Sequence, residues 1–87
     1  MTKADYLNTA SDLRRIAIWM ARGQNEKLPL IIKLWASIKS QKETAKVIKH
    51  FIGDIKPQEA TRNKELRLFF AEQALVSSLR LENQFLK

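Results

Sequence analysis

The chain contains no cysteine, two glycines, two prolines and one histidine among its 87 residues. Without cysteine it forms no disulfide and no cysteine-ligated metal site. His50 has an acidic neighbour at helical spacing, Asp54, but two ligands are too few for a structural metal site. We therefore expect no metal and no cofactor. A small domain without disulfides is typical of the reducing cytoplasm, where we expect this protein to reside.

Long apolar runs are also absent. The longest, over 16–21 and 28–32, fall far short of the ~20 residues that a membrane span needs. No apolar run follows a basic start, so we expect no signal peptide. The chain carries no glycine-rich phosphate loop, and nothing indicates a serine and an acid converging on His50. We therefore expect a protein that is not an enzyme.

Glycine and proline divide what is present into three apolar-periodic stretches of helical type, 2–22, 25–52 and 57–87. Thr2 is a suitable N-cap for the first stretch and Asn25 for the second, while Pro57 suits the first turn of the third. β-branched alternation is absent, so we expect no strands. The sequence therefore predicts an all-α fold: one domain over 1–87, built as a small antiparallel helical bundle.

The second stretch leaves two alternatives open, because its apolar face rotates by roughly 80–90° along an ideal helical wheel. Heptad drift accounts for about half of that rotation, which indicates a bend or a break near Ser40–Lys42. The sequence Ser40-Gln41-Lys42-Glu43 also matches a capping box, which would start a new helix. No glycine or proline interrupts the middle of the stretch. We favour three helices with a bend, and four helices if the second is broken.

The first stretch has one broad apolar stripe, and a stripe this wide indicates contact with two neighbouring helices. Its members are Tyr6, Ala10, Leu13, Ile16, Ala17 and Met20, widened on one flank by Leu7, Ile18 and Ala21.

The third stretch is apolar on two opposite sides, although a helix needs only one apolar stripe to pack on its own bundle. One side carries Leu68, Leu75, Leu79 and Leu86, and the other carries Leu66, Phe69, Phe70, Val76 and Leu81. We place Leu75 and Leu79 in the core. The second set then becomes the candidate interface. A domain of 87 residues has a small core, which oligomerisation would supplement, so a homodimer is favoured.

The charge balance is basic, with 16 Lys and Arg against 9 Asp and Glu, giving a net charge of +7. Such a surplus favours an acidic protein or nucleic acid as partner. Lys39, Lys42, Lys46 and Lys49 recur at spacings of three and four, which predicts one basic stripe with His50 at its edge. A stripe of lysines would bind phosphates without sequence preference. The alternative is a solvated helix face.

A second constellation joins Arg15, Trp19 and Arg22 on the first stretch, away from its main apolar stripe. A Trp flanked by guanidinium groups is typical of a partner anchor. The structural alternative is a Trp folded over the edge of the bundle. Taken together, the sequence favours a non-enzymatic interaction module that self-associates or binds a partner through the third stretch. Nucleic-acid binding through the lysines is the alternative.

Overall fold

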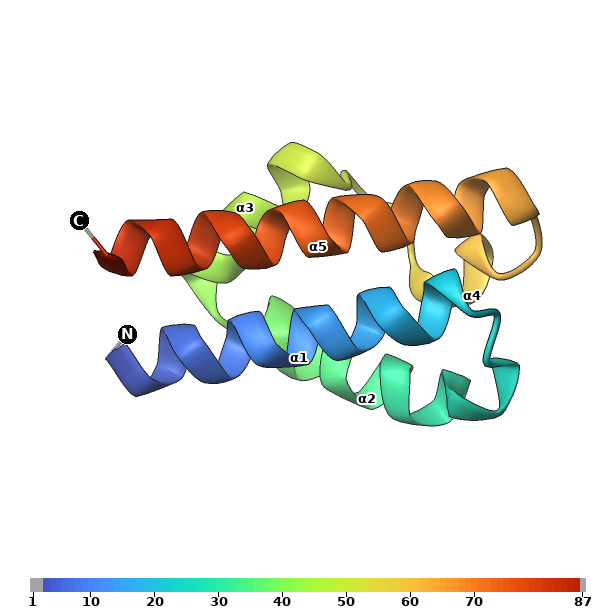
Figure 1. Ribbon diagram of the computed structural model, residues 1–87, viewed down its shortest axis with the longest axis horizontal. Coiled ribbons are helices and arrows are strands. Elements are labelled where there is room, and N and C mark those ends of the chain that lie inside the picture. The colour runs from blue at the N-terminus through green and yellow to red at the C-terminus, as the bar shows by residue number, and fades with distance from the viewer. Residues whose placement is uncertain (1–2, 87) are drawn as a thin grey trace.

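A computed structural model of the chain describes residues 3–86 and contains helices and turns with no strand in that range (Figure 1). The elements are α1 (Lys3–Ala21), a 3-10 turn η1 (Asn25–Lys27), α2 (Leu28–Lys39), α3 (Lys42–Phe51), α4 (Pro57–Ala60) and α5 (Lys64–Leu86). The predicted all-α fold is confirmed. The predicted N-cap at Thr2 lies outside the described residues.

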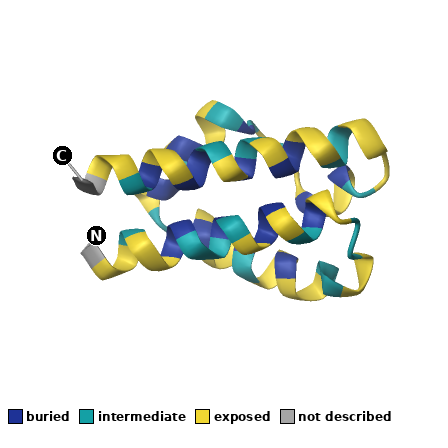
Figure 2. Ribbon diagram, viewed as in Figure 1, coloured by how far each residue is buried: buried dark blue, intermediate teal, exposed yellow. Residues whose placement is uncertain are grey.

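The two longest helices, α1 and α5, run antiparallel along each other, and both ends of the chain lie at the same end of the molecule (Figure 1). Figure 2 shows buried and exposed residues alternating along both helices, as expected where one face of each is covered. In α1 the main predicted stripe is confirmed, because Leu13, Ile16 and Met20 are almost fully buried, but the flank that was expected to widen it is exposed at Leu7 and Ile18. These side chains belong to one core cluster that also includes Ile31, Trp35, Ile38, Val47, Ile48, Phe70, Ala74 and Leu81.

The second stretch is broken, so the alternative with an additional helix is the correct one. Gln41 separates α2 from α3 with an extended backbone, φ −91° and ψ 118°. Its side-chain carbonyl accepts hydrogen bonds from the hydroxyls of Thr9 (3.1 Å) and Thr44 (3.5 Å), two residues that are themselves buried. The break therefore places a polar acceptor where two buried hydroxyls need one.

The predicted capping box at this break does not form. Ser40 donates its hydroxyl to the main-chain carbonyl of Ser37 at 2.6 Å instead of capping α3. Glu43, the other half of the motif, accepts a hydrogen bond from the Tyr6 hydroxyl. The main-chain N–H of Ser40, which Glu43 would bond in a capping box, donates instead to the carbonyl of Ala36 at 3.1 Å.

The third stretch is also broken, which corrects the prediction of one helix from Pro57. Pro57 starts only the single turn α4, and the chain turns again before Lys64. Asn63 caps α5, because its side-chain oxygen accepts the main-chain N–H of Leu66 at 3.1 Å. A strong N-cap residue can begin a new helix without any proline or glycine beside it, and the periodicity does not reveal it.

Candidate functional site

The two apolar sides of α5 are arranged differently from the sequence-based prediction. Phe70 and Leu81, which were assigned to the interface, are fully buried in the core. The Phe70 ring lies 4.9 Å from the ring of Trp35, measured between centroids, and so joins α5 to α2. Leu66 and Val76 are partly buried, and only Phe69 of that candidate interface is exposed. The assignment of Phe70 and Leu81 to an interface is therefore wrong.

The side of α5 that was assigned to the core is the exposed one. Leu68, Leu75 and Leu79 keep 41, 44 and 46% of their surface exposed. The fourth member of this side, Leu86, lies outside the residues whose side chains are described. Because three leucines on one face of a helix reach solvent, α5 does present an unpaired apolar stripe. It is the opposite stripe to the one predicted.

Small polar residues explain the reversal. Ser77 and Ser78 occupy the buried face of α5 and are fully buried. Each satisfies its hydroxyl within the helix: Ser77 donates to the carbonyl of Gln73 at 2.8 Å and Ser78 to that of Leu75 at 2.6 Å. A serine bonded to its own backbone carries no unsatisfied polar group into the core. A helical wheel based on residue polarity therefore does not identify Ser77 and Ser78 as buried positions.

The exposed stripe of α5 continues onto α1. Leu7 and Ile18, at 44 and 48% exposure, lie eleven residues apart and therefore on the same side of α1. Both belong to the flank that broadened the predicted α1 stripe. Since α1 and α5 lie side by side, their exposed aliphatic side chains form one surface, which we call the outer face: Leu7, Ile18, Leu68, Leu75 and Leu79.

A groove of about 430 Å³ runs between the two helices on the outer face. Its floor contains Ala17 and Ala71, each only 5% exposed, and small side chains at these positions leave a depression between the helices. The groove is lined by Ala17, Ile18, Ala21, Leu68, Ala71, Glu72 and Leu75. Glu72 is the one charged residue of that lining. The groove is therefore suited to an aliphatic side chain from another surface.

Ion pairs reduce the net charge beside this groove. Arg14 of α1 pairs with Glu82 of α5, which joins the two helices and neutralises both groups. Arg15 lies 3.8 Å from Asp12, in an exposed pair within one helix turn. These pairs offset part of the positive charge beside the groove, whereas Arg22, one helical turn from Ile18, is exposed.

The predicted lysine stripe is divided by the break at Gln41. Lys39 ends α2, whereas Lys42, Lys46 and Lys49 lie on α3, and all four are exposed. The three lysines of α3 share the side of that helix that faces away from buried Val47. Their role in polyanion binding stays a prediction.

Trp19 is partly buried against the core. The cation over its ring is Lys27, whose ammonium lies 5.9 Å from the ring centroid, rather than Arg15 or Arg22. Both arginines are exposed. The role of these three residues as a partner anchor stays a prediction.

The pKa of Tyr6 is clearly shifted. The hydrogen bond from the Tyr6 hydroxyl to the Glu43 carboxylate raises the pKa of Tyr6 above its ordinary value of 10.0, and the negative charge of Glu43 acts in the same direction. No group of three or more His, Asp or Glu residues within 3–86 is placed to hold a metal ion. None of the helices in that range is both long enough and apolar enough to cross a membrane.

Comparison of the chain with known protein families, with curated proteins and with solved structures found no match.

Proposed function

We propose that this protein is a non-enzymatic interaction module that pairs with a second copy of itself through the outer face. The observation that carries the proposal is the exposure of Leu7, Ile18, Leu68, Leu75 and Leu79 on one side of two adjacent helices. Single exposed aliphatic residues are ordinary on protein surfaces, but a contiguous apolar patch is typical of an interface.

The length of the helix pair is compatible with a second copy as the occupant. The molecule measures 36 × 20 × 20 Å. A contact that extended along this length would approach the ~800 Å² of accessible surface that each partner buries in a standard interface. A twofold pairing of α1 and α5 with their copies would form a four-helix layer, which is a common way to bury apolar helix faces.

Charge supports the same occupant. Two copies that each carry +7 repel one another, so a homodimer requires a contact surface with few unpaired cations. The Arg14–Glu82 pair and the acidic Glu72 in the groove lower the positive charge of the outer face. The lysines of α3 lie on a different side of the molecule. They would remain in solvent, where salt screens them over about 8 Å at physiological ionic strength.

The test is the mass in solution of matched lysine substitutions. Light scattering and sedimentation equilibrium at micromolar to near-millimolar concentration should give twice the 10.1 kDa of one chain. Leu75→Lys places a charge in the groove and should return the mass to that of a monomer. Ile32→Lys is the matched control, because Ile32 is an exposed aliphatic residue on α2, away from the outer face.

A wild-type protein that stays monomeric over this concentration range contradicts the proposal. Equal loss of dimer in both variants also contradicts it, because the effect would then reflect added charge and not the groove. A wild-type monomer that binds a different protein through Leu75 would identify a heterologous partner as the occupant, which also overturns pairing with a second copy.

A further inference from the structure

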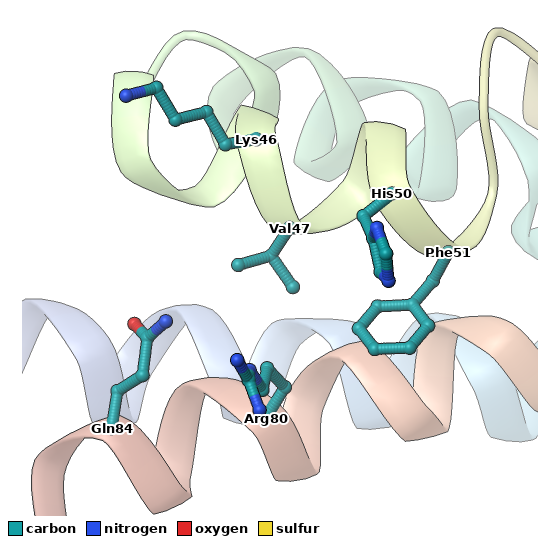
Figure 3. Close-up of a pocket in the computed structure, with 6 residues that line it drawn as sticks. All are labelled: Lys46, Val47, His50, Phe51, Arg80 and Gln84. Carbon is teal, nitrogen blue, oxygen red and sulfur yellow. The ribbon is translucent and has the colours of Figure 1, made fainter.

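A second recess lies between α3 and α5, on the flank of α5 that faces away from the groove. It has a volume of about 280 Å³ and is lined by Lys46, Val47, His50, Phe51, Arg80 and Gln84 (Figure 3). The first four of these residues belong to α3, and the last two belong to α5. The Gln84 side chain points toward α3, the Arg80 side chain lies beside α5 below Val47, and Lys46 runs along α3 at the edge of the recess (Figure 3). We call this recess the basic cleft.

The polar groups of the basic cleft are mainly hydrogen-bond donors, and none of its lining residues is acidic. Lys46 and Arg80 supply positive charge, and His50 and Gln84 add N–H donors. Within residues 3–86, neither Lys46 nor Arg80 makes an ion pair. This distinguishes Arg80 from Arg14, which is paired with Glu82.

Two nearby carboxylates are held by α1. Glu43 precedes Lys46 by one helical turn, but it accepts a hydrogen bond from Tyr6. Glu82 follows Arg80 by two residues and pairs with Arg14. Neither carboxylate lines the basic cleft or forms an ion pair with Lys46 or Arg80, so the positive charge of the cleft is open to an anion from outside.

The donor set fits a phosphate group. An arginine guanidinium presents two parallel N–H groups to phosphate oxygens, and a lysine ammonium adds a mobile point charge. The floor of the cleft is apolar. Val47 and Phe51 contribute apolar surface, and the Phe51 ring packs edge-on with the His50 ring at 4.8 Å between centroids. A ligand that combines phosphate with a sugar or base would use both parts.

The surroundings of the cleft indicate an extended ligand. Lys42 and Lys49 are exposed on the solvent side of α3, next to Lys46. An isolated phosphate compound in the cleft would leave these cations unused, whereas a chain of phosphates would pass over them. We propose that the basic cleft is the centre of a binding site for the phosphate backbone of nucleic acid, with Arg80 and Lys46 as the principal phosphate contacts.

The sequence pattern predicted a role in polyanion binding for the lysines but not for Arg80 or Gln84. These two residues lie on α5, which is separated from α3 in the sequence by α4 and the turns on either side of it. This inference does not depend on pairing through the outer face, which occupies a different surface.

The test is fluorescence anisotropy with labelled oligonucleotides of about 15 nucleotides, as single strands and as a duplex, from about 50 to 200 mM salt. The variants are Lys46→Gln and Arg80→Gln, separately and combined. Their matched controls are Lys33→Gln and Arg62→Gln, which remove the same charges from exposed positions elsewhere. Far-ultraviolet circular dichroism verifies that each variant is folded.

Loss of both contacts should reduce the slope of log affinity against log salt by about 1.4 for single strands and about 1.8 for duplex DNA. The double control should change the slope by much less. Binding of single strands or of duplex with this pattern supports the proposal, and the two arms identify which form supplies the phosphates. The proposal is overturned if neither form binds at the lowest salt. It is also overturned if controls and cleft variants lose affinity equally, or if inorganic phosphate alone binds as tightly as the strands.

Discussion

The guanidinium of Arg67, in the first turn of α5, donates a hydrogen bond to the main-chain carbonyl of Met20 at 2.5 Å, near the end of α1. It also donates to the carbonyl of Ala21 at 3.2 Å. The last carbonyls of a helix lack partners within the helix and attract positive charge. Arg67 therefore ends α1 from another helix, and the contact fixes how α1 and α5 are aligned where Ile18 and Leu68 line the groove.

The first prediction tests this contact. Arg67→Met keeps most of the aliphatic stem but removes both hydrogen bonds to α1. The free energy of unfolding should fall by about 1–2 kcal/mol, which is the range for a hydrogen bond from a charged group discounted for partial exposure. Urea titration measures it. Arg62→Met, in the exposed turn before α5, is the control and should leave the midpoint unchanged. Equal midpoints for both variants would show that Arg67 does not stabilise the helix pair.

The second prediction compares the two glycines, which both adopt positive φ, +67° at Gly23 and +77° at Gly53. Alanine at either position should cost about 1 kcal/mol, because an L-residue is strained there. Gly23→Ala should cost more, since its added Cβ would lie 3.0 Å from Nη1 of Arg67, whereas the Cβ at Gly53 would meet nothing within 4 Å. In an Arg67→Met background, thermal unfolding should show the difference between the two alanine variants disappearing.

The third prediction contrasts the two sides of α5. Phe70→Ala should lower the free energy of unfolding by about 3–5 kcal/mol, because it opens a cavity in the core. Leu75→Ala should change it by about 0.5 kcal/mol or less when measured at a concentration too low for dimerisation, as at an ordinary surface position. A loss at Leu75 as large as that at Phe70 would place the exposed stripe in the core.

The two sides of α5 also show how much of this helix could be predicted from the sequence. The wheel revealed two apolar sides, and the structure retains one exposed stripe. It did not reveal which side the bundle covers, because the buried side also includes Ser77 and Ser78, two polar residues that neither apolar set contained. Their hydroxyls are satisfied by carbonyls of the same helix, a short-range bond that hydropathy does not register.

Prediction from the sequence succeeded where local signals agreed. In α1 a regular apolar stripe up to Gly23 gave both the helix and its buried residues, including Leu13 and Ile16. It was less successful at Gln41, because that break is stabilised by a hydrogen bond from Thr9, a residue 32 positions away. The basic cleft was missed for a similar reason: Lys46 and Arg80 come together only when α3 packs on α5.

The last prediction uses Tyr6, which is the only tyrosine in the chain and can therefore be titrated without interference. Its hydrogen bond to Glu43 raises its pKa, so the phenolate absorbance of the folded protein should appear with a midpoint above 10.0. Glu43→Gln removes the negative charge and should move the midpoint back toward the ordinary value.

The same bond makes stability depend on pH with a defined sign. The pKa of Tyr6 is higher in the folded than in the unfolded chain, so the folded state favours the protonated hydroxyl. The contribution to stability is therefore complete below pH 10 and is lost as pH rises through the raised pKa. Urea midpoints of wild type and Tyr6→Phe should differ at pH 8 and converge at strongly alkaline pH. A Tyr6 midpoint that is the same in wild type and Glu43→Gln would show that the two side chains do not interact in solution.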